Sequence, residues 1–142
     1  MYKYFQPNEK DIKDEYGDCQ IRAITKAFGI SWKNAFDVIC KACLEIQCVP
    51  SDAKALEYLL RDKLGYDLYG IRIQKGKKRM TVSKFANKFR HGTYIIGVAN
   101  HCVTVINGHY YDTWDCGDSC IYTVYTKNGG ELDGCKDFAK RK

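Results

Sequence analysis

The chain has 142 residues and a formal net charge of +6, and 45% of its residues are hydrophobic and 13% aromatic. This composition excludes disorder as the main state, because disordered chains lack aromatic and branched residues. The length fits one domain with a buried core. We therefore treat residues 1–142 as a single domain with an N-terminal arm over residues 1–17 and a peripheral basic tail over residues 129–142.

Three helices are predicted in the first half of the chain. The first covers Cys19–Phe28, because its apolar residues recur at helical spacing, and the glycine after it favours a helix end. Ser31 is a preferred N-cap residue and predicts a second helix over Trp32–Ile46. The third helix is expected to begin at residues 50–51, to carry a leucine stripe and to end at Gly65.

The second half is predicted to be mainly strands. Alternating residues predict a strand over Tyr66–Ile73, residues 75–79 form a basic loop, and Thr81 caps a short helix. Four further strands are expected over Tyr94–Ala99, His101–Ile106, His109–Trp114 and Ile121–Thr126. Helices followed by strands favour an α+β fold in which N-terminal helices pack on a C-terminal antiparallel β-sheet.

No segment of the chain predicts association with a membrane. The longest apolar runs are far shorter than the ~20 residues that cross a bilayer, and residues 1–20 lack the apolar centre of a signal peptide. We therefore expect a cytoplasmic protein, located in the host cytoplasm if the chain is phage-encoded. In that compartment the eight cysteines are expected to be free, metal-bound or catalytic rather than paired in disulfides.

Cys19 is the first candidate functional residue. It lies in the first turn of a predicted helix, where unpaired N–H groups and the helix dipole stabilise a thiolate. A backbone N–H group there can also face a developing oxyanion. The neighbouring carboxylate of Asp18 opposes a thiolate, so a cationic partner is expected. A buried structural cysteine is the alternative, because most free cysteines are of that kind.

His101 and Asp112 are predicted to meet across a hairpin. An Asn-Gly dipeptide at residues 107–108 favours a tight turn that pairs Ile106 with His109. Alternation then places His101 and Asp112 on one face as diagonal neighbours, with backbones roughly 7–8 Å apart. Asp112 would orient the imidazole, and the other ring nitrogen would deprotonate a thiol. A shift of one residue in the pairing would remove this arrangement.

Two segments resemble known enzymes. Residues 17–24, with the sequence GDCQIRAI, are similar to the nucleophile helix of small bacterial and phage-encoded papain-like cysteine peptidases. Residues 101–115 resemble the strands that carry the His and the Asp of those enzymes. The resemblance extends in order from Cys19 to Thr126. It implies a papain-like fold and a catalytic triad of Cys19, His101 and Asp112 that works through an acyl-thioester.

The oxyanion donor departs from the pattern of that family. Papain-like enzymes carry a Gln six residues before the nucleophile, and Lys13 occupies that position here. We expect Gln6 to serve as the donor, with Asn8 and Lys13 as alternatives. Trp114, beside the predicted base, is expected to line the substrate-binding site, although aromatic residues in strands commonly serve packing.

The predicted function is that of a cysteine hydrolase, a peptidase or isopeptidase. We expect a monomer that acts on a protein or peptide and uses no cofactor and no metal. Three alternatives are an inactive relative that binds a host protein, a transferase or deamidase with the same triad, and a basic nucleic-acid-binding module. Nucleic acid is the less favoured partner, because neither the run at residues 75–79 nor the tail is interleaved with aromatic residues.

The remaining cysteines allow a second kind of site. Paired thiolates are common in structural zinc sites, but the spacings here are not those of a typical zinc motif, and packing in the core is the preferred interpretation. The cysteines concerned are Cys40, Cys43, Cys48, Cys116 and Cys120.

Overall fold

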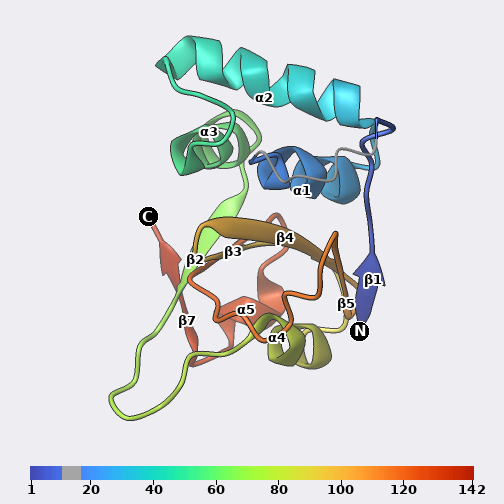
Figure 1. The fold of residues 1–142 in the computed structure, drawn as a ribbon. Helices are drawn as coiled ribbons and strands as arrows, with labels where there is room; N and C mark the ends of the chain where they lie inside the picture. Colours follow the sequence, from blue (N-terminus) through green and yellow to red (C-terminus); the bar gives the residue numbers. More distant parts are fainter. Residues whose placement is uncertain (11–16) are drawn as a thin grey trace.

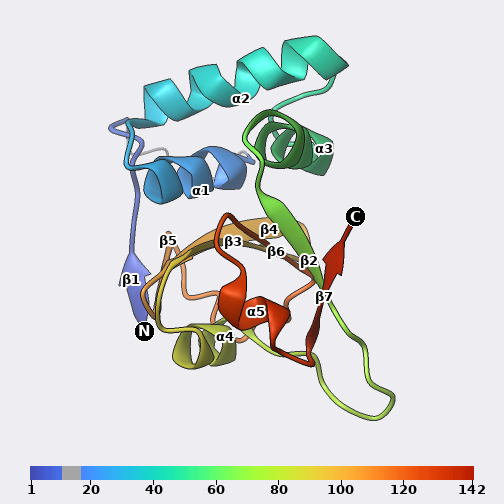
Figure 2. The ribbon, with the colours of Figure 1, turned by 180° about the vertical axis from the view of Figure 1, so that it is seen from behind.

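The structure, a computed structural model, describes residues 1–10 and 17–142. In chain order the elements are β1 (Tyr2–Tyr4), α1 (Cys19–Phe28), α2 (Trp32–Ile46), α3 (Ala53–Glu57), η1 (Tyr58–Lys63), β2 (Asp67–Ile71), α4 (Val82–Lys88), β3 (Thr93–Val98), β4 (His101–Ile106), β5 (His109–Asp112), β6 (Thr123–Thr126), α5 (Gly130–Asp133) and β7 (Phe138–Arg141). The strands form one mixed sheet in the order β1-β5-β4-β3-β6-β2-β7. Helices α1 to α3 lie on one face of this sheet, and α4 and α5 lie on the other (Figures 1 and 2).

The first two helices confirm their predicted bounds. A glycine in the left-handed conformation ends α1, and the hydroxyl of Ser31 accepts a hydrogen bond from the N–H of Asn34 at 3.1 Å to cap α2. The third helix begins later than predicted, because Asp52 caps it, and it widens into the π-helical turn η1. None of the helices in the described ranges is long and apolar enough to cross a membrane.

The hairpin that carries the candidate base has the predicted register. Ile106 pairs with His109, and Asn107 and Gly108 have positive φ angles of 49° and 85°, as this tight turn requires. Strand β5 ends at Asp112, two residues before its predicted end at Trp114. The paired residues of β4 and β5 extend from the turn to the pair formed by Thr104 and Tyr111.

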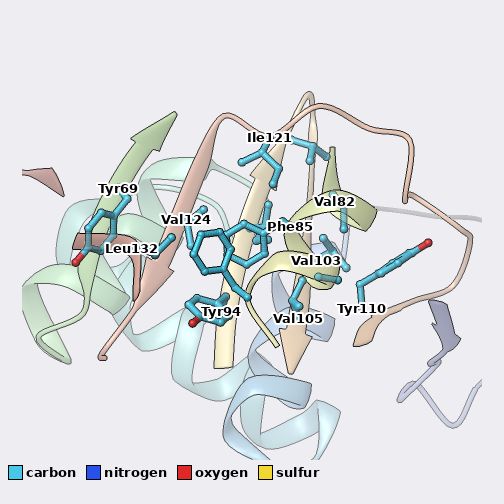
Figure 3. Packing of buried hydrophobic residues seen from close by; sticks show 14 of the residues in the cluster. Tyr69, Val82, Phe85, Tyr94, Val103, Val105, Tyr110, Ile121, Val124 and Leu132 are labelled. Carbon is cyan, nitrogen blue, oxygen red and sulfur yellow. The ribbon is translucent and has the colours of Figure 1, made fainter. Parts of the chain in front are cut away.

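The sheet is buried between two hydrophobic cores. One core joins it to α1, α2 and α3, and Ile24 and Ile95 are fully buried there. The other core contains Phe85 of α4, which packs on the sheet beside Val103 and Tyr94 (Figure 3). Cys102 belongs to the first core and its neighbour Val103 to the second, as the alternation of a strand requires. The site therefore rests on a strand that is fixed from both sides.

Both terminal segments correct the sequence-based prediction. The start of the N-terminal arm is a strand, β1, which runs parallel to β5, so the sheet is mixed rather than antiparallel. The basic tail forms β7 at the opposite edge of the sheet, and Phe138 is 3% exposed. Both segments are too short to show a period of two, and each adds a partner to a strand that would otherwise have an open edge.

The burial of Phe138 gives a test of the C-terminal segment. Its ring packs edge-on against Phe85 and Phe89, at 5.8 and 5.9 Å between centroids. Phe138→Ala should lower the free energy of unfolding by about 3–5 kcal/mol in urea titrations, because a buried phenylalanine leaves a cavity. The matched variant Phe36→Ala, at an exposed position of α2, should cost less than about 1 kcal/mol. Equal small losses would show that the segment is a solvated tail.

Candidate active site

Cys19 lies at the N-terminus of α1 and borders a cleft of about 460 Å³. The cleft is formed between the start of α1, the segment that leads into α3, the turn between β3 and β4, and the start of β6. Its lining includes His101, Cys102, Asn100, Gly97, Leu56 and Tyr122. Gly97 leaves room for Thr123, because a Cβ atom at Gly97 would lie 2.3 Å from the Thr123 hydroxyl. The structure thus brings the predicted nucleophile and base to one cavity.

The surroundings of Cys19 favour a thiolate. The Cys102 thiol donates a hydrogen bond to the Cys19 sulfur, and this bond, with the hydrogen bond and charge of His101, lowers the pKa of Cys19 to about 5. Burial of the sulfur acts in the opposite direction but is outweighed. The thiol of Cys102 correspondingly has a raised pKa, because it donates to Cys19 and is buried. The N-terminus of α1 adds unpaired N–H groups near this sulfur.

His101 is held by Asp112, as the sequence predicts. Its Nε2 atom lies 2.5 Å from Oδ2 of Asp112, so Asp112 occupies this ring nitrogen. Burial of the ring by itself lowers the pKa of His101, but hydrogen bonds to Asp112 and to two cysteine thiols raise it to about 11. Near neutral pH the site therefore holds an imidazolium beside a thiolate. Asp115, by contrast, accepts hydrogen bonds from the Tyr110 hydroxyl and the Gly117 N–H.

Arg22 is a functional candidate that the sequence reasoning missed. Its guanidinium is buried between two carboxylates, pairing with Asp18 and lying 3.4 Å from Oδ1 of Asp112. Asp18 also accepts a hydrogen bond from the indole of Trp32. These contacts neutralise the carboxylate that was expected to oppose the thiolate of Cys19. The signal was present in the sequence, since Asp18 and Arg22 are four residues apart on one helical face.

Cys116 is a second residue that the sequence reasoning did not place here. Its buried thiol interacts with His101 and Asp112. Within the described part of the chain, these three are the only group of at least three possible metal ligands, with ligand atoms within 4.8 Å of one another. Burial raises the pKa of Cys116, which favours the neutral thiol over the thiolate that a metal needs. The hydrogen bond between His101 Nε2 and Asp112 Oδ2 already occupies the space between two of the three possible ligand atoms.

Among the described residues, the other cysteines form no group of three possible metal ligands. All eight thiols are free. Cys43 is buried in the core beside α1 and α3, and its pKa is raised to about 11 by burial and by a hydrogen bond with Cys48. Core packing, the preferred interpretation, accounts for Cys43.

Two of the further candidates, Gln6 and Trp114, lie in the described part of the chain. Gln6 follows β1 and accepts a hydrogen bond from the Asn8 N–H at 3.0 Å, so its oxyanion role stays a prediction. Lys13 lies outside the described residues. Trp114 is 41% exposed, and the centroid of its ring lies 5.1 Å from that of the His101 ring. Trp114 is not among the residues that line the cleft. Gln20 does line it, and its amide is bonded to the backbone of the segment before α3.

Comparison of the chain with protein-family models, with curated proteins and with solved structures gives no match.

The pKa of Cys19 gives a direct test of the ion pair. Iodoacetamide should alkylate Cys19 already at pH 6, with a rate that is half-maximal near pH 5, because the thiolate is the reacting form. Cys40 is the internal control, since burial raises its pKa and it should react only in alkaline solution. Rates are read by mass-spectrometric mapping of each cysteine.

Two variants separate the causes of this reactivity. His101→Ala removes the cation and Cys102→Ala removes the donor, so each should move the Cys19 profile to higher pH without changing Cys40. Uniform labelling of all eight cysteines, or a profile that neither variant moves, would contradict the ion pair.

Proposed function

We propose that the chain is a papain-like cysteine hydrolase in which Cys19 is the nucleophile, His101 the acid and base, and Asp112 the residue that orients the imidazole. The observation that carries this proposal is that Cys19 and His101 line one cleft while Asp112 holds the His101 ring at 2.5 Å, and the charge of His101 helps to lower the pKa of Cys19 to about 5. A nucleophile, a base within reach and a third group that holds the base are the parts that covalent catalysis needs.

The first half of the reaction forms an acyl-enzyme. The Cys19 sulfur attacks the carbonyl carbon of an amide or isopeptide bond, and the electron pair of the C=O bond moves to oxygen. Backbone N–H groups at the start of α1 stabilise this oxyanion, because the first helical hydrogen bond is donated by Arg22 to the Asp18 carbonyl. The C–N bond then breaks as His101 gives its proton to the leaving amine.

The second half releases the acid. His101 is now neutral and takes a proton from water, which attacks the thioester carbonyl. The C–S bond breaks and the thiolate returns beside the imidazolium, so the net reaction consumes one water and yields one carboxylic acid and one amine. Throughout, Asp112 keeps the Nε2 side of the ring occupied and leaves the other nitrogen toward the sulfur.

The experiment that tests the proposal uses a degenerate peptide library with internal amide bonds and Lys-linked branches. New termini are identified by mass spectrometry after incubation with the wild-type chain and with Cys19→Ala. We expect cleavage that requires Cys19, persists in the presence of a metal chelator and stops after iodoacetamide. Loss of activity with the chelator would instead favour a metal at His101, Asp112 and Cys116.

The same assay distinguishes the alternative functions. Added hydroxylamine competes with water for a thioester, so a hydrolase or transferase should yield hydroxamates. Release of ammonia from Gln side chains without new termini would indicate a deamidase. A wild-type chain that alkylates at Cys19 but neither cleaves nor transfers any substrate would favour an inactive binding protein.

The Asp112 position predicts a graded loss of activity. Asp112→Asn should lower turnover roughly ten-fold, or about 1.4 kcal/mol of barrier, because Asn still orients the ring but removes the charge that supports the imidazolium. Asp112→Ala should cost more, since the ring is then free to rotate.

Asp115→Asn is the matched control for this series. Asp115 is exposed, and its carboxylate bonds Tyr110 and Gly117 rather than His101, so turnover should stay close to that of the wild-type chain. Thermal melts of all three variants separate loss of fold from loss of catalysis. An inactive Asp115→Asn together with an active Asp112→Ala would overturn the assignment of the orienting residue.

A further inference from the structure

A second cavity, of about 320 Å³, lies at the loop between β2 and α4 and is lined mainly by cations. The loop extends away from the sheet close to the start of β7 (Figures 1 and 2). The cationic lining residues come from this loop, from α4 and from the segment before β7: Arg72, Lys77, Lys78, Arg79, Lys84 and Lys136. We call this feature the cationic cavity.

Within the described residues, most charges of the cationic cavity have no acidic partner. Among the described residues that line it, Asp137 is the single acid, and its carboxylate is shared with Lys88 at 3.5 Å. None of the six cations forms an ion pair with another described residue. Like charges held around one cavity repel one another, and a bound anion would relieve that repulsion.

Part of the lining is fixed by the fold. The backbone N–H of Arg72 donates to the Asp137 carbonyl at 2.7 Å, and its Nε donates to the Phe138 carbonyl at 3.3 Å. The guanidinium of Arg79 lies 3.9 Å from the centre of the Tyr122 ring. Two of the cations are therefore positioned by contacts with the backbone before β7 and with the Tyr122 ring.

The cationic cavity is adjacent to the catalytic cleft. Tyr122 lines the cleft. The guanidinium of Arg79, which lines the cationic cavity, packs on the Tyr122 ring. The backbone makes the same connection, since the Ile71 N–H donates to the Tyr122 carbonyl at 3.1 Å. A chain that extends from Cys19 past Tyr122 would thus reach the cations.

We propose that the cationic cavity is a substrate subsite that binds an acidic segment of the protein whose amide bond Cys19 attacks. This inference rests on the proposed hydrolase function and adds the substrate class, a protein with Asp or Glu residues on one side of the bond. An acidic peptide fits better than a nucleic acid, because none of the described residues that line the cationic cavity is aromatic and could stack bases, and Arg79 covers the Tyr122 ring.

Binding is tested apart from catalysis, with the Cys19→Ala chain. A fluorescein-labelled decaglutamate should bind in anisotropy titrations, more weakly as salt rises, and a labelled decaserine should not. Lys77→Glu/Lys78→Glu should weaken binding by about ten-fold or more, because like charges then face the probe. The control Lys33→Glu/Lys41→Glu, which makes the same change in net charge at exposed positions of α2, should bind as the parent does.

A second pair of substitutions controls for the case in which Lys77→Glu/Lys78→Glu weakens binding only by disturbing the fold of the loop. Lys84→Glu/Lys136→Glu comes from the other two segments of the lining and should cause the same loss. Equal binding of decaserine, unchanged affinity in both cavity variants, or tighter binding of a ten-nucleotide RNA than of decaglutamate would overturn the proposal.

Cleavage then separates this proposal from the function on which it rests. Products of the peptide library should be enriched in Asp and Glu on one side of the cut, and Lys77→Glu/Lys78→Glu should abolish that preference while cleavage continues. Cleavage with no acidic preference would refute the subsite and leave the hydrolase intact. Salt-sensitive decaglutamate binding without any cleavage would refute the hydrolase and leave an acidic-protein binding site.

Discussion

The buried carboxylate of Asp112 is the point on which the candidate site depends. Its side chain accepts from His101 and lies against the guanidinium of Arg22, so it connects β4 and α1 to the end of β5. Its backbone carbonyl accepts from the Phe5 N–H and the Tyr2 hydroxyl, which adds the N-terminal segment. A buried charge is costly unless it is paired, and removing one partner leaves the others uncompensated. The orientation of the imidazole is therefore tied to the packing of β4, β5, α1 and the N-terminal segment.

Three thiols lie at the candidate site, and their surroundings shift their pKa values in different directions. Cys19 lies at a helix N-terminus with a donor and a cation beside it, and its pKa falls. Cys102 is buried and donates to Cys19, and Cys116 is buried beside the Asp112 carboxylate, so both pKa values rise. The same residue type thus provides one thiol with a lowered pKa, the proposed nucleophile, and two thiols with raised pKa values. Cys116 also contacts His101, so the difference comes from the Cys102 donor and the helical N–H groups at Cys19, and from burial and the Asp112 carboxylate at Cys116.

The cleft and the cationic cavity lie on either side of Tyr122, where β6 begins and β2 ends. The strands that hold this boundary are buried between two cores, whereas the cations come largely from a loop. Such a division is common, because a rigid sheet fixes the reacting groups while exposed loops supply binding residues. The excess positive charge of the chain therefore has a specific location relative to the proposed chemistry.

The sequence by itself determined the local structure: the bounds of α1 and α2, their caps, and the hairpin register that brings His101 near Asp112. These features depend on neighbours in the chain, on glycine and Asn geometry and on periodicity, so they can be derived from residue types. The tertiary structure decided the parallel pairing of β1, the edge strand β7, the burial of Arg22 and Cys116 at the triad, and the cationic cavity beside the cleft. Each of these depends on segments far apart in the chain, whose contacts leave no periodic pattern and are fixed only when the sheet assembles.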